Sequence, residues 1–162
     1  MNAGYRIESG ARADVPQIAA LMRDYWSFEG LAGFEVARVS ELLRQLLSQS
    51  HLGAVWVARE GGKVVGYLLA VFVFSFEYQG LLAEIDELYV SPHARRHGIA
   101  TGLLEVAEAG FAEAGCTGVQ LQLAAGNHAA HAFYHRRGYA ARAAYGLLDK
   151  RLAPVSVGRV FR

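Results

Sequence analysis

The sequence has little of what cross-links or interrupts a small protein. Its single cysteine, Cys116, excludes an intramolecular disulfide framework and any multi-cysteine metal site. It contains only 3 prolines, and no linker, internal repeat or low-complexity tract divides it. We therefore expect one domain spanning residues 1–162, a length that can bury a sizeable core without cross-links.

An excess of one charge sign is also missing. The formal net charge is +1, whereas a dedicated nucleic-acid binder is usually strongly basic. Any positively charged patch must therefore be local. We expect no nucleic-acid partner.

No hydrophobic run is long enough for a transmembrane helix. The most apolar stretch, VVGYLLAVFVFSF at residues 64–76, is too short to span a bilayer, and its Val, Phe and Tyr content predicts a buried strand. The N-terminal segment MNAGYRIESGARADV carries charges where a signal peptide needs an apolar run. We expect a cytoplasmic protein with no membrane partner.

The sequence does contain a regular succession of helical and strand patterns. Hydrophobic residues make up 53% and charged residues 19% of the chain, which is typical of a compact globular protein. The order of these patterns is ααβββαβαββ, and it predicts an α/β (α+β) fold in which helices cover a mixed, mostly antiparallel sheet. The predicted helices cover residues 11–28, 35–49, 98–113 and 127–137, and the predicted strands cover 53–60, 63–76, 81–90, 118–125, 139–145 and 147–152.

Positive charge and small residues gather at one helix entry. The stretch RRHGIA, residues 95–100, follows a predicted strand and opens a long helix. The first amides of a helix lack partners and its dipole favours anions, and neither Gly98 nor Ala100 carries a side chain that would keep an anion away. The stretch has neither the GK[ST] ending of a P-loop nor the spacing of a dinucleotide fingerprint. On these residues alone it fits a phosphate site, a nucleic-acid contact or ordinary helix-entry chemistry.

A second motif, NHAAHAFYHRRGY at residues 127–139, lies at the next strand-to-helix junction. Together with RRHGIA and with LYVSP at residues 88–92, it resembles the GCN5-related N-acetyltransferase (GNAT) family. RRHGIA matches the family's [QR]-x-x-G-x-[GA] pyrophosphate loop. The second motif matches the family's Asn followed by Ala-x-x-FY-x-x-x-G-F/Y. The resemblance extends from residue 5 to Leu152 and implies a GNAT-like fold.

The resemblance implies that acetyl-coenzyme A is the co-substrate. Tyr134 matches the tyrosine that protonates the departing thiolate, and Asn127 matches a cofactor-binding residue, although it equally fits the N-cap of its helix. No metal is expected, because the three histidines His128, His131 and His135 share a helix face without an interleaved carboxylate or cysteine. The implied cofactor-binding residues are Leu88, Tyr89, Val90, Arg95, Arg96, His97, Gly98, Ile99, Ala100, Thr101, Asn127 and Tyr134.

The catalytic base is expected on the strand AEIDELYV, residues 83–90. Strand alternation puts Glu84 and Asp86 on one face and Glu87 on the other. Because similar family members carry an acidic residue at these positions, the resemblance favours Glu84 first and Asp86 second. A bulge would bring Glu87 into the cleft instead. The other interpretation is a solvated strand face or pairing with arginines.

The expected function is transfer of an acetyl group to a primary amine by direct attack in a ternary complex. The acidic strand favours a small cationic amine as the acceptor. The alternatives are a peptide N-terminus or lysine as the acceptor, and a noncatalytic acyl-coenzyme A-binding module. The segment around Trp26 and Glu29 corresponds to the lid of the family's acceptor cleft, although Tyr25 and Trp26 equally fit a hydrophobic core. The resemblance also implies a homodimer.

Overall fold

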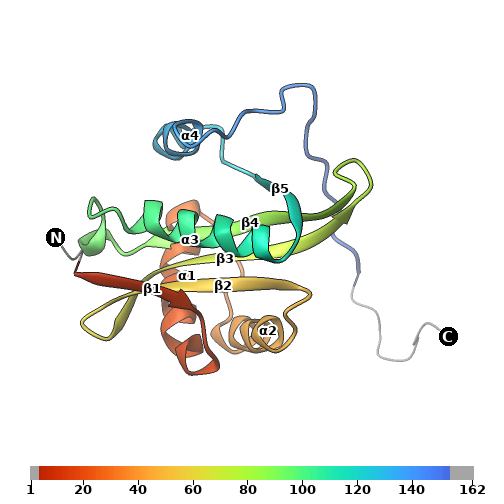
Figure 1. Cartoon of the computed structure of the whole chain (residues 1–162). Helices are drawn as coiled ribbons and strands as arrows, with labels where there is room; N and C mark the ends of the chain where they lie inside the picture. The colour runs from red at the N-terminus through yellow and green to blue at the C-terminus, as the bar shows by residue number, and fades with distance from the viewer. Residues whose placement is uncertain (1–3, 154–162) are drawn as a thin grey trace. The chain divides into compact units, whose positions relative to one another are not determined.

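The computed structural model describes residues 4–153 and contains a sheet of five strands in the order β1-β2-β3-β4-β5 (Figure 1). By contacts the chain divides into two compact units, residues 1–122 and 123–162, and each is described by itself. The first unit holds the sheet and three helices: β1 (Tyr5–Ser9), α1 (Val15–Glu29), α2 (Val36–Ser48), β2 (Gly53–Glu60), β3 (Lys63–Ser75), β4 (Gly80–Val90), α3 (Ile99–Glu113) and β5 (Cys116–Leu121). The second unit holds α4 (His128–His135).

The strands β1 to β4 pair antiparallel in sequence order, and β5 joins β4 in parallel. The helices α1 and α2 cover one face of this sheet and α3 covers the other (Figure 1). The alternation along β2 explains the division: Val55 and Val57 belong to the core beneath α1 and α2, whereas Trp56 packs edge-on against Phe111 of α3. Both faces are apolar, so the central strands are buried on both sides.

Two glycines let α3 lie close to the sheet. A Cβ atom on Gly102 would lie 2.6 Å from Cδ1 of Ile7, and one on Gly110 would lie 2.5 Å from Cζ2 of Trp56. Both distances are too short for non-bonded carbon atoms, so Ile7 and Trp56 would have to shift for α3 to stay this close to β1 and β2 with larger residues there. This packing holds α3 close to the sheet, and the helix begins at Ile99, within the stretch RRHGIA.

A charged cluster joins the first two strands to the start of α1. Arg59 of β2 donates to the carboxylates of Glu8 and Asp14, and Asp14 also accepts from the backbone amide of Ala11 at 2.8 Å. Asp14 precedes the first residue of α1, as the sequence predicts for an N-cap, but its side chain makes no capping bond to that helix. Its carboxylate instead pairs with Arg59.

The predicted fold class is confirmed, with differences at both ends of the chain. The sequence did not predict β1, a five-residue strand that pairs with the edge of β2. Residues 139–145 and 147–152 were expected to form strands, and they form none in the structure. Tyr145 and Leu148 are strongly exposed, and without a paired neighbour an alternating sequence does not make a strand. Within residues 4–153 no helix has the length and apolarity that a bilayer crossing needs.

Candidate functional site

A β-bulge in β4 shapes the candidate site. On the neighbouring β3, Ala70 pairs with Ile85 and Leu69 pairs with Glu87, so Asp86 is an extra residue without a partner in the register. The parallel pairing with β5 ends at the same place, where Ile85 meets Leu121. Residues 86–90 of β4 therefore continue beyond the paired part of β5. The bulge shifts the alternation of side chains along β4 by one residue. Glu84 and Glu87 therefore both face α1, whereas the regular alternation expected from the sequence put them on opposite faces.

A pocket of about 280 Å³ lies beside this bulge. Its walls come from the C-terminal part of α1 and from β4, with one residue after the end of β5. Three of the lining residues are carboxylates and none carries a positive charge. The lining residues are Tyr25, Glu29, Leu31, Glu84, Ile85, Asp86 and Gln122.

The two predicted base residues, Glu84 and Asp86, both line this pocket, but they differ in their surroundings. The carboxylate of Glu84 accepts a hydrogen bond of 2.6 Å from the side-chain amide of Gln120 on β5. Asp86 is exposed on the pocket side, and its pKa is raised because nearby protein atoms displace part of its water and because the carboxylate of Glu84 is near. A raised pKa makes the carboxylate of Asp86 a better proton acceptor than an ordinary aspartate.

Negative charge also affects the tyrosine in the pocket. Burial is the main cause that raises the pKa of Tyr25 to about 12, and the carboxylates of Glu29, Glu87 and Asp86 add to it. Tyr25 therefore stays protonated well above neutral pH. The sequence left its position between lid and core undecided; it lines the pocket and also packs at 6.0 Å from the ring of Tyr89.

Glu87 lies behind the pocket and is only 7% exposed. Its Oε1 accepts a hydrogen bond from the indole nitrogen of Trp26 at 3.0 Å, and its Oε2 accepts one from the hydroxyl of Tyr67 at 2.5 Å. Burial raises the pKa of Glu87, and these two bonds act against that rise. Sequence analysis did not identify Tyr67 as a partner of this carboxylate. It lies in an uninterrupted apolar stretch, where nothing in the sequence indicates that its hydroxyl binds a carboxylate.

The loop RRHGIA joins the short 3-10 turn Pro92–Ala94 to α3. Gly98 has φ +79° and Arg96 has φ +65°, both in the left-handed region. This backbone path leads directly into the first amides of α3, those of Ile99 and Ala100, which have no partner within the helix. His97 contributes a contact of 3.3 Å between Nδ1 and the carbonyl oxygen of Ala94.

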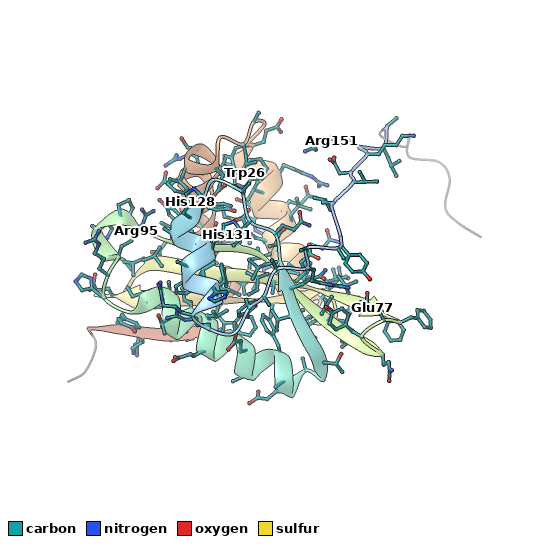
Figure 2. The ribbon with its side chains drawn as sticks, turned by 90° about the horizontal axis from the view of Figure 1, so that it is seen from above. Trp26, Glu77, Arg95, His128, His131 and Arg151 are labelled. Atoms are coloured by element: carbon teal, nitrogen blue, oxygen red, sulfur yellow. The ribbon has the colours of Figure 1, made fainter. Side chains whose placement is uncertain are left out.

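Arg95 points back toward the sheet and α1. Its Nε donates to the carbonyl oxygen of Val90 at 2.8 Å. Its guanidinium carbon lies 5.7 Å from the ring centre of Phe28 and 5.4 Å from that of Tyr89. Figure 2 shows Arg95 on the loop between β4 and α3. The side chain therefore holds the loop against the end of β4 and the last turn of α1.

The positions of the other predicted site residues on β4 and α3 follow from these two elements. Leu88 and Val90 lie on the part of β4 that continues past β5, where their backbone groups are the contacts that the family resemblance implies. The ring of Tyr89 is buried near Tyr67, at 6.4 Å between ring centres, so only its backbone belongs to this strand edge. Thr101 follows in the first turn of α3.

The second unit carries the remaining predicted residues. Oδ1 of Asn127 accepts from the amide of Ala130 at 3.1 Å, which makes it the N-cap of α4. The buried ring of Tyr134 packs edge-on against Phe133 at 5.1 Å and Tyr139 at 5.3 Å.

Across residues 4–153, no group of three or more His, Cys, Asp or Glu side chains is arranged to hold a metal.

Known proteins are similar to this chain in sequence and in fold. The model of the Acetyltransferase (GNAT) family matches residues 16–139. The chain is 26% identical over 133 residues to the uncharacterized N-acetyltransferase YhfO of Bacillus subtilis (strain 168), covering 82% of this chain and 88% of that protein.

Two solved structures are similar over nearly the whole chain. One is the integron cassette protein HFX_CASS3 from the mobile metagenome of Cole Harbour Salt Marsh, with 27% identity, a TM-score of 0.80, and coverage of 92% of this chain and 91% of that one. The other is the aminoglycoside acetyltransferase meta-AAC0020 from an uncultured soil metagenomic sample, with 24% identity, a TM-score of 0.73, and coverage of 96% and 99%. The family match spans most of the chain and includes both motifs, RRHGIA and NHAAHAFYHRRGY, and the chain therefore belongs to the GNAT family of acetyltransferases.

Proposed function

We propose that this acetyltransferase moves an acetyl group from acetyl-coenzyme A to a primary amine of a small cationic acceptor, by direct attack in a ternary complex. The observation that carries the proposal is the pocket beside the β4 bulge, where α1 and β4 contribute three carboxylates and no basic residue. A cationic amine is the ligand that such a pocket attracts. The aminoglycoside acetyltransferase with the same fold acts, by its name, on a compound of this class.

The residues at the loop fit the co-substrate. The left-handed backbone at Gly98 leads into the unpaired first amides of α3, a position that favours a phosphate group. Residues 88–90 of β4 continue beyond β5 and offer backbone groups for an extended chain. Acetyl-coenzyme A supplies the activated acetyl group when bound. These features support the expectation that residues 95–101 hold its pyrophosphate.

We assign proton transfer first to Asp86. A protonated amine cannot attack, so a base must take its proton before or during formation of the C–N bond. Asp86 has a raised pKa, and it lines the pocket. Glu84 lines it too, but Gln120 holds its carboxylate in a fixed hydrogen bond, which suits binding of the ammonium group better than proton transfer. This proposed assignment reverses the order expected from the sequence, which put Glu84 first and Asp86 second.

The leaving sulfur must gain a proton as the C–S bond breaks. The family resemblance assigns this donation to the hydroxyl of Tyr134, and we retain that assignment as part of the proposal. An ammonium group loses two protons on the way to the amide: Asp86 takes one before attack and releases it to solvent, and the nitrogen loses the second after the C–N bond has formed. The thiolate receives one proton from Tyr134, and the second nitrogen proton replaces it, so one proton is released per turnover. Electrostatic stabilisation of the carbonyl oxygen would come from backbone amides of β4 around Leu88 and Val90.

The decisive experiment measures thiol release from acetyl-coenzyme A with a panel of acceptors. The panel contains 1,3-diaminopropane, an aminoglycoside, a neutral primary amine, a peptide with a free N-terminus and a lysine peptide. Turnover should be fastest with the small polycationic amines. Turnover only with a peptide would refute the acceptor class. Tight binding of acetyl-coenzyme A with no turnover on any amine would instead indicate the noncatalytic binding module.

A further inference from the structure

The buried carboxylate of Glu87 takes no part in the proposed chemistry, yet both of its oxygens are engaged. Oε1 accepts from Trp26 of α1 at 3.0 Å and Oε2 accepts from Tyr67 of β3 at 2.5 Å. The three side chains belong to three different elements, separated by 61 and 20 residues along the chain. A buried charge held this way joins those elements at one point.

Trp26 lies on α1 (Figure 2), between the pocket residues Tyr25 and Glu29 in the sequence. It directly follows Tyr25 on α1, and its carbonyl oxygen accepts a hydrogen bond of 2.8 Å from the amide of Leu31. Tyr25 and Leu31 both line the pocket. The indole ring also packs edge-on against Phe34, at 5.4 Å between ring centres. The bond from Trp26 to Glu87 therefore fastens this wall to the sheet.

The other end of that bond is next to the bulge. Glu87 directly follows Asp86, the extra residue of β4, and pairs with Leu69 of β3. A bulge disrupts the local ladder of backbone bonds, so the orientation of Asp86 depends on what holds the next residue. The side-chain bonds from Trp26 and Tyr67 provide that constraint.

We propose that Glu87 is a positioning residue for acetyl transfer, which fixes the α1 wall of the acceptor pocket against the bulged wall that carries Asp86. This role rests on the proposed function, because it matters only if an amine reacts in this pocket. Glu87 acts through Trp26 and Asp86 and does not itself touch the acceptor. A carboxylate is suited to the task because a hydrogen bond to a charged acceptor is stronger than one between neutral groups.

The kinetic test compares Trp26→Phe, Glu87→Gln and Glu87→Ala with the wild-type enzyme. Trp26→Phe removes the indole donor and should raise the KM for 1,3-diaminopropane about tenfold, the size of one lost hydrogen bond to a charged group. Glu87→Gln keeps an oxygen for Trp26 and should raise it less, whereas Glu87→Ala should raise it most. The Kd of acetyl-coenzyme A, measured by calorimetry, should stay at the wild-type value in all three.

Trp56→Phe is the matched control. It removes the other tryptophan, which packs against Phe111 on the opposite face of the sheet, and it should lower the Tm without changing the acceptor KM. A role in folding alone would make the Glu87 variants behave like this control, and that result would overturn the proposal. Equal losses in acceptor and acetyl-coenzyme A binding would overturn it too.

A readout that needs no turnover separates this inference from the proposed function. The chain has 2 tryptophans, so the indole N–H signals in a nitrogen-15 spectrum are assigned by Trp26→Phe. The chemical shift of the Trp26 indole N–H should change with pH as Glu87 titrates, and this pH dependence should be lost in Glu87→Gln. The same signal should also shift when 1,3-diaminopropane is added. A Trp26 signal that ignores both pH and the diamine would refute the link, even in an enzyme that turns over. Shifts in a wild-type protein that acetylates no amine would refute the proposed function, and the positioning role of Glu87 in it.

Discussion

Replacing Gly98 should distinguish the contribution of the loop RRHGIA to cofactor binding from its contribution to the stability of the fold. Gly98 has φ +79°, and a Cβ atom there would find its nearest neighbour, the hydroxyl of Tyr5, at 3.5 Å. The space is ordinary, so the cost of a side chain comes from the backbone conformation and not from a clash. A residue other than glycine in the left-handed region costs roughly 1–2 kcal/mol, and a β-branched residue costs more.

The variants to compare are Gly98→Ala and Gly98→Val. If the loop keeps its path, Gly98→Ala should lower the Tm by about 2–8 °C, because 1 kcal/mol corresponds to roughly 2–4 °C in a protein of this size. If the loop instead relaxes, the Tm changes little and the affinity for acetyl-coenzyme A falls by the same free energy, about 5- to 30-fold. Either way the sum of the two losses should be near the backbone cost, and greater for Gly98→Val.

Differential scanning calorimetry and isothermal titration measure the two quantities on the same protein. Gly126→Ala is a suitable control, because this glycine has no positive φ and no atom within 4 Å of its Cβ position. Wild-type Tm together with wild-type affinity in Gly98→Val would refute the role given to this loop. A collapse of the whole fold would refute the claim that the cost is local.

Three further predictions concern the pocket and the core. Asp86→Asn should lower kcat and remove the rise of kcat/KM with pH that ionisation of Asp86 produces. The raised pKa disfavours the ionised form in the folded state, so the Tm of the variant should exceed that of the wild type above about pH 4, with no gain at lower pH. The gain should be small, because Asp86 is exposed and solvent screens its charge. If Glu84→Gln has these kinetic effects and Asp86→Asn does not, the assignment is reversed. Glu29→Gln should raise the KM for a diamine more than for a monoamine, and equal changes in the two steady-state assays would exclude a charge contact from Glu29. Gly110→Ala places a methyl group 2.5 Å from Cζ2 of Trp56 and should cost about 1–3 kcal/mol in a urea titration; an unchanged midpoint would mean that α3 shifts freely over the sheet.

The elements that carry local signals could be predicted from the sequence. The helix opening at Gly98 and the strand before it follow from periodicity and turn chemistry, and the motif match places them in the family. The acidic strand was also identified, because Glu84 and Asp86 stand out in an apolar segment. For these residues, spacing along the chain was enough.

Contacts between distant segments could not be predicted in this way. The sequence EIDELYV fits a regular strand, and only pairing with β3 shows that Asp86 is an extra residue. The partners of Glu87 lie 61 and 20 residues away, and an indole or phenol in an apolar run carries no sign of its hydrogen bond. The strand β1 was missed for a related reason, since five residues with two apolar positions become a strand only beside β2.

Two groups of carboxylates in the first unit differ in the charge of their hydrogen-bond donors, and this difference bears on function. Near the start of α1, Glu8 and Asp14 are neutralised by the guanidinium of Arg59. At the pocket, Gln120 donates to Glu84, and Trp26 and Tyr67 donate to Glu87; all three donors are neutral. Neutral donors satisfy a carboxylate without cancelling its charge.

Keeping that charge costs stability, because like charges at close range repel. A cation bound in the pocket would offset this cost. A cationic acceptor therefore predicts a salt dependence of binding that a neutral acceptor does not. The KM for a cationic amine should rise as ionic strength increases, since salt screens the attraction between exposed charges. The KM for acetyl-coenzyme A, an anion bound at another place, supplies the comparison within the same experiment. An acceptor KM that is indifferent to salt would mean that the three carboxylates do not attract the substrate, and the acidic pocket would need another explanation.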